Sequence, residues 1–144
     1  MSYFSVFDIS AAGMSVQKTR VDVVALNLAN SETTKTAEGG AYKPLQVVIS
    51  EAIGADKFSN MLADQLQGSQ LAGSYVAQIR PIQDPTKMVH KPSHPEADAN
   101  GMVEYPNIDP VSEMVSLLEA TRAYEANVKV LNAGTAMAQS ALEL

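Results

Sequence analysis

The sequence predicts a mainly α-helical protein with a small β region. Long N- and C-terminal helices should form a coiled-coil-like inner domain, and the middle of the chain should form a small antiparallel β domain. At both ends, apolar residues recur every three or four positions, whereas in the middle they alternate with polar ones. Abundant Ala, Val and Leu with seven Met, only three Phe and no Trp also favour helix-on-helix packing.

These patterns divide the chain into three parts. Residues 1–30 are expected to form the N-terminal helix of the inner domain, and residues 109–144 its C-terminal helix. Residues 31–108 are expected to form the β-rich middle domain, with a mobile segment at 50–73.

In the N-terminal part, apolar or small residues follow one another at alternating steps of three and four. They are Ile9, Ala12, Val16, Thr19, Val23 and Leu26, with Val21, Val24 and Leu28 as a flanking set. We expect a helix of roughly 20 to 25 residues from about Asp8 to Asn30, with Ser5 and Asp8 as a capping pair. Because the flanking set widens the apolar surface, this helix should contact more than one neighbour.

The middle part reads as short strands that form one small antiparallel sheet. Residues 45–49 are rich in β-branched side chains, residues 75–80 alternate, and shorter strand-like pieces follow at 88–89 and 102–105. Prolines stand between these pieces, as expected at strand ends and sheet edges. Residues 54–73 could form a short amphipathic helix or a mobile loop, and we favour the loop.

The C-terminal part holds the helical period longest. Its stripe consists of Met114, Leu117, Thr121, Tyr124, Val128, Leu131, Thr135, Ala138 and Leu142. Asp109-Pro110 is a suitable N-cap and first helical residue, because the proline needs no hydrogen-bond partner in a first turn. Oppositely charged residues stand at pairing distance on the outer faces: Glu119 with Arg122, and Glu125 with Lys129.

Composition excludes several classes of function. The formal charge of −6 argues against binding nucleic acid, which requires clustered Lys and Arg. The absence of Cys excludes disulfides and thiolate chemistry. Without a run of about twenty apolar residues or a basic, then apolar, leader, we expect a soluble chain that leaves the cytoplasm, if at all, without a cleaved signal peptide.

Two histidines suggest a metal site but lack its context. His90 and His94 are four residues apart, the spacing of zinc ligands on a helix. Pro92 and Pro95 prevent that helix, and no third ligand is evident. We therefore expect loop histidines in solvent.

Two further runs resemble ligand-binding loops. Residues 96–101 match the start of a calcium loop, but Asn107 stands where its bidentate Glu belongs, so a turn at Asn100-Gly101 is the better interpretation. Gly39-Gly40 lacks the Lys-Ser/Thr sequel of a phosphate loop. We predict no catalytic residues, no cofactor, no metal and no enzymatic activity.

The two terminal stripes leave two arrangements open. They could pack on each other as a hairpin within the chain, or pack against other chains. With helices of about 23 and about 33 residues, a hairpin would leave the end of the longer stripe uncovered, which favours contacts with other chains. Small residues on both helices would allow several helices to approach closely, among them Ala11, Gly13, Ala25, Ala133 and Gly134.

Three runs carry a resemblance to a known family. Asn27 to Asn30 resembles the shared signature of the axial proteins of the bacterial flagellar rod and hook, and 94–101 together with 122–127 resembles the proximal-rod branch of that family. Residues 31–36 and 51–73 depart from the pattern.

The resemblance implies a structural subunit that polymerises with itself and other rod proteins into the proximal rod, a torque-transmitting drive shaft. It also implies export by the flagellar type III apparatus without a cleaved signal, assembly in the periplasm, and contacts with other proximal-rod proteins, the distal-rod protein and the basal export-gate adaptor. A small helical export chaperone or adaptor is the alternative, and an enzyme acting on cell-wall glycan a third possibility.

We assign subunit packing to residues of the two terminal stripes and of the N-terminal signature. They are Ile9, Val16, Val23, Leu26, Asn27, Leu28, Asn30, Met114, Leu117, Tyr124, Val128, Leu131, Ala138 and Leu142.

Overall fold

The computed structural model describes residues 3–51 and 73–142. In chain order the elements are α1 (Tyr3–Ala29), β1 (Leu45–Glu51), β2 (Ser74–Pro81), β3 (Thr86–His90), β4 (Met102–Pro106) and α3 (Pro110–Leu142). The prediction for 50–73 falls mostly on residues 52–72, which lie outside the described residues.

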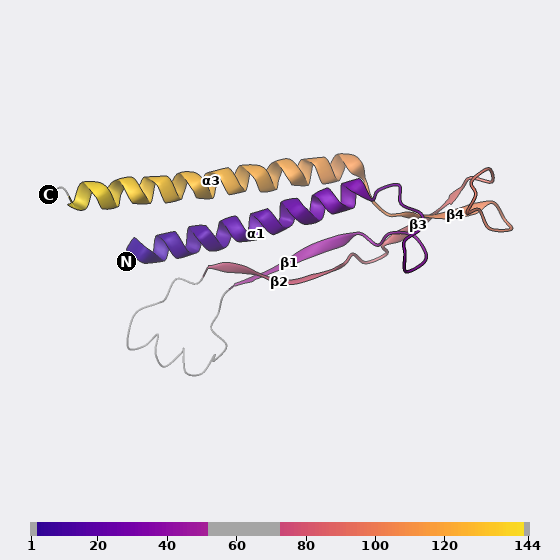
Figure 1. Cartoon of the computed structure of the whole chain (residues 1–144), viewed down its shortest axis with the longest axis horizontal. Coiled ribbons are helices and arrows are strands. Elements are labelled where there is room, and N and C mark those ends of the chain that lie inside the picture. Colours follow the sequence, from indigo (N-terminus) through magenta and orange to yellow (C-terminus); the bar gives the residue numbers. More distant parts are fainter. Residues whose placement is uncertain (1–2, 52–72, 143–144) are drawn as a thin grey trace, which may run out of the picture.

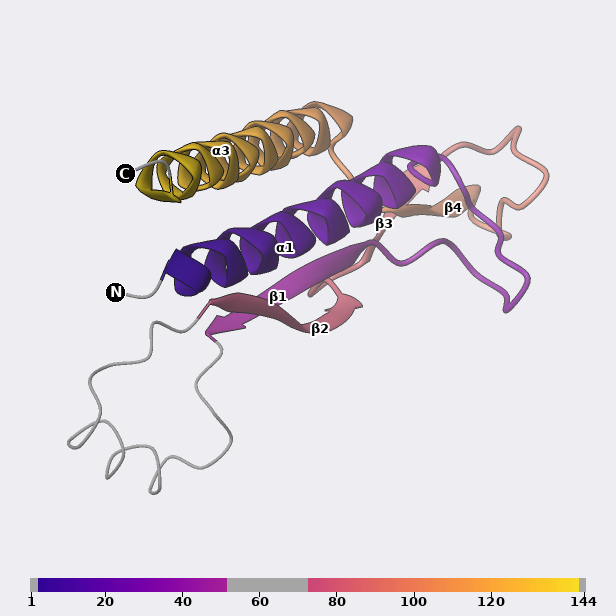
Figure 2. The ribbon, with the colours of Figure 1, turned by 60° about the vertical axis from the view of Figure 1, so that its left-hand side comes forward.

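Helix α1 is the middle layer of the molecule. It lies beside α3 in antiparallel orientation, so both chain ends are at the same end of the helical pair (Figure 1). The β1–β2 hairpin packs along another side of α1, and the β3–β4 hairpin lies beyond the opposite end (Figures 1 and 2). Among the described residues, α3 makes its packing contacts with α1 and not with the strands.

The N-terminal helix is longer than expected because its first turns have packing partners. It begins at Tyr3, so Ser5 and Asp8 lie inside the helix and the expected capping pair is wrong. Phe7 provides the reason, since its ring lies against Gly134 of α3. The predicted end is confirmed: the Asn30 N–H donates to Leu26 O at 3.1 Å, and α1 stops at Ala29.

Helix α3 begins where the sequence predicts. The Val111 N–H donates to Asp109 Oδ1 at 3.2 Å, and the Glu113 N–H donates to Asp109 O at 3.0 Å. Asp109 is therefore the N-cap and Pro110 the first helical residue. The ion pairs expected on the surface of α3, Glu119 with Arg122 and Glu125 with Lys129, are not formed. The ion pair found among the described residues joins Lys35 and Glu96.

The middle of the chain forms two separate hairpins and not one sheet. β1 pairs with β2 from Leu45↔Pro81 to Glu51↔Ser74, and β3 pairs with β4 from Thr86↔Pro106 to His90↔Met102. Pro81 ends β2 and Pro85 immediately precedes β3, so neither position offers a backbone donor and the two ladders stay separate. The four strand positions themselves agree with the predicted ones.

Small residues allow α1 and α3 to pack closely. A Cβ added at Gly13 would lie 3.0 Å from the side-chain amide of Asn127, whereas a Cβ at Gly134 would meet the Phe7 ring at 3.6 Å, an ordinary contact. A side chain at Gly13 therefore requires Asn127 to move, whereas Gly134 has space for one. The two helices differ by six residues, 27 against 33, a smaller mismatch than the sequence suggested.

These two glycines give a matched test of the helix pairing. Gly13→Leu should destabilise the chain by about 1 to 3 kcal/mol through overpacking against Asn127. Gly134→Ala should stabilise it by up to about 1 kcal/mol, because alanine is the better helix former and has space. Thermal unfolding followed by circular dichroism measures both. A Gly13→Leu protein that melts like the unsubstituted chain would contradict the antiparallel contact.

Candidate subunit-packing surfaces

Asn27 joins the end of α1 to the start of β1. Its side chain is 2% exposed, and its Nδ2 donates to Leu45 O at 2.9 Å. Its Oδ1 accepts from the Leu45 N–H at 2.9 Å and from the Tyr42 hydroxyl at 3.1 Å. The amide thus pairs with Leu45 as a neighbouring strand would, and every polar atom of this buried group has a partner.

Glu113 lies at the same junction, from the first turn of α3. Burial raises the pKa of its carboxyl above the ordinary value, and the nearby Asn27 amide, which favours the charged form, offsets this only in part. Burial also raises the pKa of Tyr42, and the charge of Glu113 adds to the effect. The ends of α1, α3 and β1 therefore meet at a partly buried acid.

The N-terminal packing residues mostly face inward. Val16, Val23 and Asn27 are buried, whereas Leu26 is 50% exposed. The remaining members are half-buried: Ile9, Leu28 and Asn30. Ile9 lies near Gly73, just before β2, so part of this stripe faces the β1–β2 hairpin and not a second helix.

The C-terminal stripe only partly faces α1. Four of its members are half-buried: Leu117, Val128, Leu131 and Ala138. Met114 and Tyr124 are exposed, and Leu142 is the last residue of the helix. The line of closest packing is rotated from the predicted stripe, and runs through Ala120, Asn127 and Gly134. Ala120 and Gly134 are small, and Asn127 lies against Gly13, because the helices are closest along this line.

A second apolar surface on α3 was missed from the sequence. We call it the outer face of α3: Val111, Val115, Leu118, Ala126, Val130, Ala133 and Met137. All seven are exposed, and the five large side chains among them are between 48% and 63% exposed. Steps of three and four separate most of them. This helical period was present in the sequence and could have indicated a second apolar face, but the predicted stripe shows the period more regularly.

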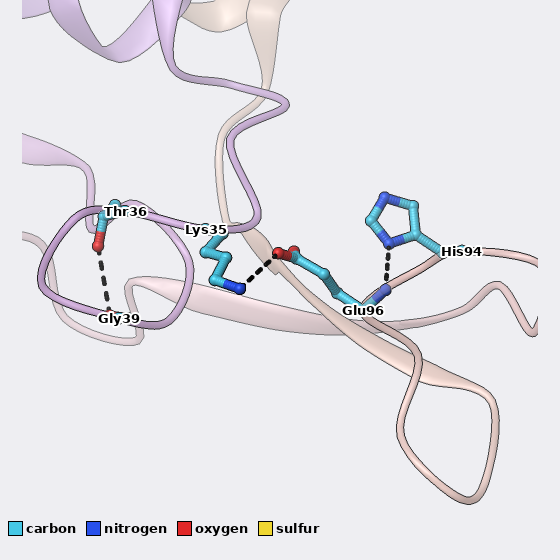
Figure 3. Close-up of polar contacts among 5 residues, drawn as sticks. All are labelled: Lys35, Thr36, Gly39, His94 and Glu96. Carbon is cyan, nitrogen blue, oxygen red and sulfur yellow. Dashed lines mark hydrogen bonds and ion pairs between the residues drawn. The ribbon is translucent and has the colours of Figure 1, made fainter.

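The loops beyond the helices are tied together by polar contacts. Lys35 Nζ lies 3.8 Å from Glu96 Oε1, which links the loop after α1 to the β3–β4 connection (Figure 3). Within that connection, Asp98 Oδ1 accepts from the N–H groups of Asn100 and Met102, both at 2.8 Å, and Gly101 has φ of +71°. The predicted turn is confirmed, and the carboxylate that a calcium loop would use is engaged in it.

The histidines do not converge on a site. His94 Nδ1 accepts from the Glu96 N–H at 3.2 Å, and its ring stands edge-on to Tyr105. His94 is half-buried by these contacts, where solvent exposure was expected, while His90 is exposed at the end of β3. Over residues 3–51 and 73–142, no three His, Asp or Glu side chains are grouped to hold a metal ion.

Neither helix in these ranges is long and apolar enough to cross a bilayer.

Removing the Asn27 side chain should destabilise the junction. Asn27→Ala leaves the N–H and C=O of Leu45 without partners, at a cost of about 1 to 3 kcal/mol. Asn132→Ala is the control, because Asn132 is an exposed residue of α3 and alanine favours helix there. Urea unfolding compares the two; equal midpoints for both variants would show that the Asn27 contacts contribute nothing.

The partly buried Glu113 should make stability depend on pH. Because the folded pKa of Glu113 is raised, its protonation stabilises the fold; this contribution is present below the ordinary carboxyl pKa and is lost as the pH rises through the raised one. Glu113→Gln should therefore raise the melting temperature at pH 7, and the gain should shrink as the pH falls. The control is Glu119→Gln, at an exposed position of the same helix. If Glu113→Gln does not raise the melting temperature at pH 7, or raises it equally at every pH, the pKa of Glu113 is not raised.

Comparison with known proteins agrees with a role in assembly. Residues 99–144 match the family described as "Flagellar basal body rod FlgEFG protein C-terminal". A flagellar basal-body rod protein FlgC from Bacillus subtilis is 38% identical, over all of this chain and 99% of its own length. FlgC of Salmonella typhimurium is 36% identical and FlgC of Borreliella burgdorferi 34%, each over all of this chain and 98% of its own. On this full-length similarity, the chain belongs to the FlgC family of flagellar basal-body rod proteins.

Proposed function

We propose that this rod protein polymerises with further copies of itself and with other rod proteins into the proximal rod, which transmits torque and lets exported proteins pass. The full-length similarity to FlgC supports the rod assignment, and the uncovered outer face of α3 supports polymerisation. Monomeric proteins rarely leave large contiguous apolar surfaces in water, and such surfaces mark sites of protein contact. Head-to-tail contacts that do not close into a ring generate a helical filament.

In this proposal the helices of residues 1–30 and 109–144 form the inner, coiled-coil-like part of the rod, and residues 31–108 form its β-rich part. Subunit packing is assigned to the residues derived from the sequence, both those that face inward in the single chain and those that are exposed. A polar junction around Asn27 holds the helices and β1 in a fixed relation, which a load-bearing subunit requires.

The partners proposed are copies of the chain, the other proximal-rod proteins, the distal-rod protein and the basal export-gate adaptor. Export through the flagellar type III apparatus without a cleaved signal and assembly in the periplasm complete the proposal. The alternative, an export chaperone or adaptor, is not favoured, because the similar proteins across the whole chain are named as rod proteins.

Location provides the most direct test of this proposal. An epitope-tagged chain should restore swimming to cells that lack the native protein, and it should copurify with detergent-extracted basal bodies. A chain that stays in the cytoplasmic fraction of swimming cells supports the chaperone alternative and contradicts the rod assignment.

Charges inside the helical contact should prevent assembly. Leu117→Asp or Leu131→Asp places a carboxylate on the partly buried side of α3, which costs several kcal/mol of packing and desolvation. We expect cells with either variant not to swim, whereas Asn132→Asp, at an exposed position beside Leu131, should leave swimming intact. Swimming cells with either leucine variant would refute the packing assignment.

A further inference from the structure

The outer face of α3 has a counterpart on the same molecule. The side of α1 that faces neither α3 nor the β1–β2 hairpin carries small and charged residues, and we call it the open face of α1. Its exposed members are Asp8, Ala11, Ser15, Lys18, Asp22, Ala25, Leu26 and Ala29. Steps of three and four separate most of them, as on the outer face of α3.

The two faces are complementary in size. The outer face of α3 presents Val, Leu and Met side chains, whereas four of the eight members of the open face of α1 are Ala or Ser. Large side chains that pack into a surface of small ones let two helices approach closely. Both faces point away from the α1–α3 contact, so they cannot cover each other within one chain.

The charges on the two faces are also complementary. Arg122 interrupts the outer face of α3, and Asp22 is one of three charged residues on the open face of α1, beside Asp8 and Lys18. Both are exposed, and the ion pair found among the described residues, Lys35–Glu96, involves neither. In an antiparallel register that sets Arg122 against Asp22, Glu125 comes level with Thr19, one residue from Lys18, which is within reach of a second opposite-charge pair.

The same register aligns the apolar residues. It brings Val115 level with Ala29, Leu118 with Leu26, and Ala133 with Ala11. Antiparallel is the orientation required if all copies in a polar filament point the same way, because α1 and α3 are antiparallel within each copy. Within the chain, Asn127 lies opposite Gly13, whereas in this register it would lie opposite Gln17 of the second copy. The second copy is therefore displaced by four residues, about 6 Å at about 1.5 Å per residue.

We propose that the outer face of α3 packs antiparallel against the open face of α1 of a second copy of this chain, with Arg122 paired to the partner's Asp22. This inference rests on the proposed polymerisation and names its contact. The contact is heterologous, so each copy offers one face to each of two neighbours and the series does not have to close.

Charge reversal tests the ion pair. Asp22→Arg and Arg122→Asp should each weaken association between copies about tenfold, equivalent to about 1.4 kcal/mol, and the double variant should restore it. Both sites are exposed in the single chain, so circular dichroism should show unchanged helicity and melting for all three proteins. Association is read from swimming and from the cross-linking described next.

Engineered cysteines measure the register, because the chain has none of its own. Ala11→Cys combined with Ala133→Cys should give disulfide-linked copies in isolated basal bodies under mild oxidation. An intrachain bond is not expected, since it requires Cα atoms within about 7 Å and both residues are exposed, outside the buried part of the helix contact. Ala25→Cys with Ala133→Cys is the matched control, displaced by about 21 Å along α1, and should link at least about tenfold less.

The outcomes separate this inference from the proposed function. The inference is supported if copies cross-link, if the yield falls on single charge reversal, and if it recovers in the double variant. Equal linkage by both cysteine pairs, no linkage by either, or a double reversal no better than the singles would overturn it, provided that the chain is present in the basal bodies. Absence of the chain from basal bodies of swimming cells would instead overturn the proposed function.

Discussion

The main physical constraint on this molecule is that α3 is apolar on two opposite sides while one chain provides only α1 to cover it. The side that runs through Ala120 and Gly134 is covered by α1. The outer face, from Val111 to Met137, extends over most of the helix and stays in solvent. Each exposed aliphatic side chain would gain roughly 1 kcal/mol or more from being covered, so the surplus favours contact with other chains. The hairpin and the multi-chain arrangement, which the sequence left as alternatives, are therefore compatible.

A buried polar junction holds the elements in place beneath this surface. Asn27 satisfies both backbone groups of Leu45 and accepts from Tyr42, so the end of α1, the following loop and β1 are fixed together. Glu113 closes the junction from α3 and is partly desolvated there. Hydrogen bonds in such a site specify one geometry because any other leaves buried groups without partners. Apolar packing alone does not fix the direction of a contact. A subunit that transmits load through packed helices therefore needs directional hydrogen bonds of this kind as well.

Local features of the fold were predictable, whereas contacts between distant segments were not. The cap at Asp109-Pro110, the turn at Asn100-Gly101 and the positions of the strands follow from short-range chemistry, and all agree with the structure. The expected cap at Ser5 failed because Phe7 packs on Gly134, a contact between opposite ends of the chain. Asn27 was identified only by family resemblance, and its partners lie fifteen and eighteen residues away along the chain. The predicted stripe of α3 was offset because periodicity shows that a helix is amphipathic, but not which of two apolar sides its neighbour covers.

Thiol labelling at the outer face of α3 tests the central claim most directly. A single Cys at Val130, which is 48% exposed, should react with a water-soluble maleimide in the free chain and become protected in isolated basal bodies. A Cys at Ala37, which is exposed in the loop after α1 and is not part of this face, serves as the reference for reagent access. The account predicts protection at position 130 relative to that reference. Equal labelling of position 130 in the free and assembled protein would contradict it, because the outer face would then remain open in the rod.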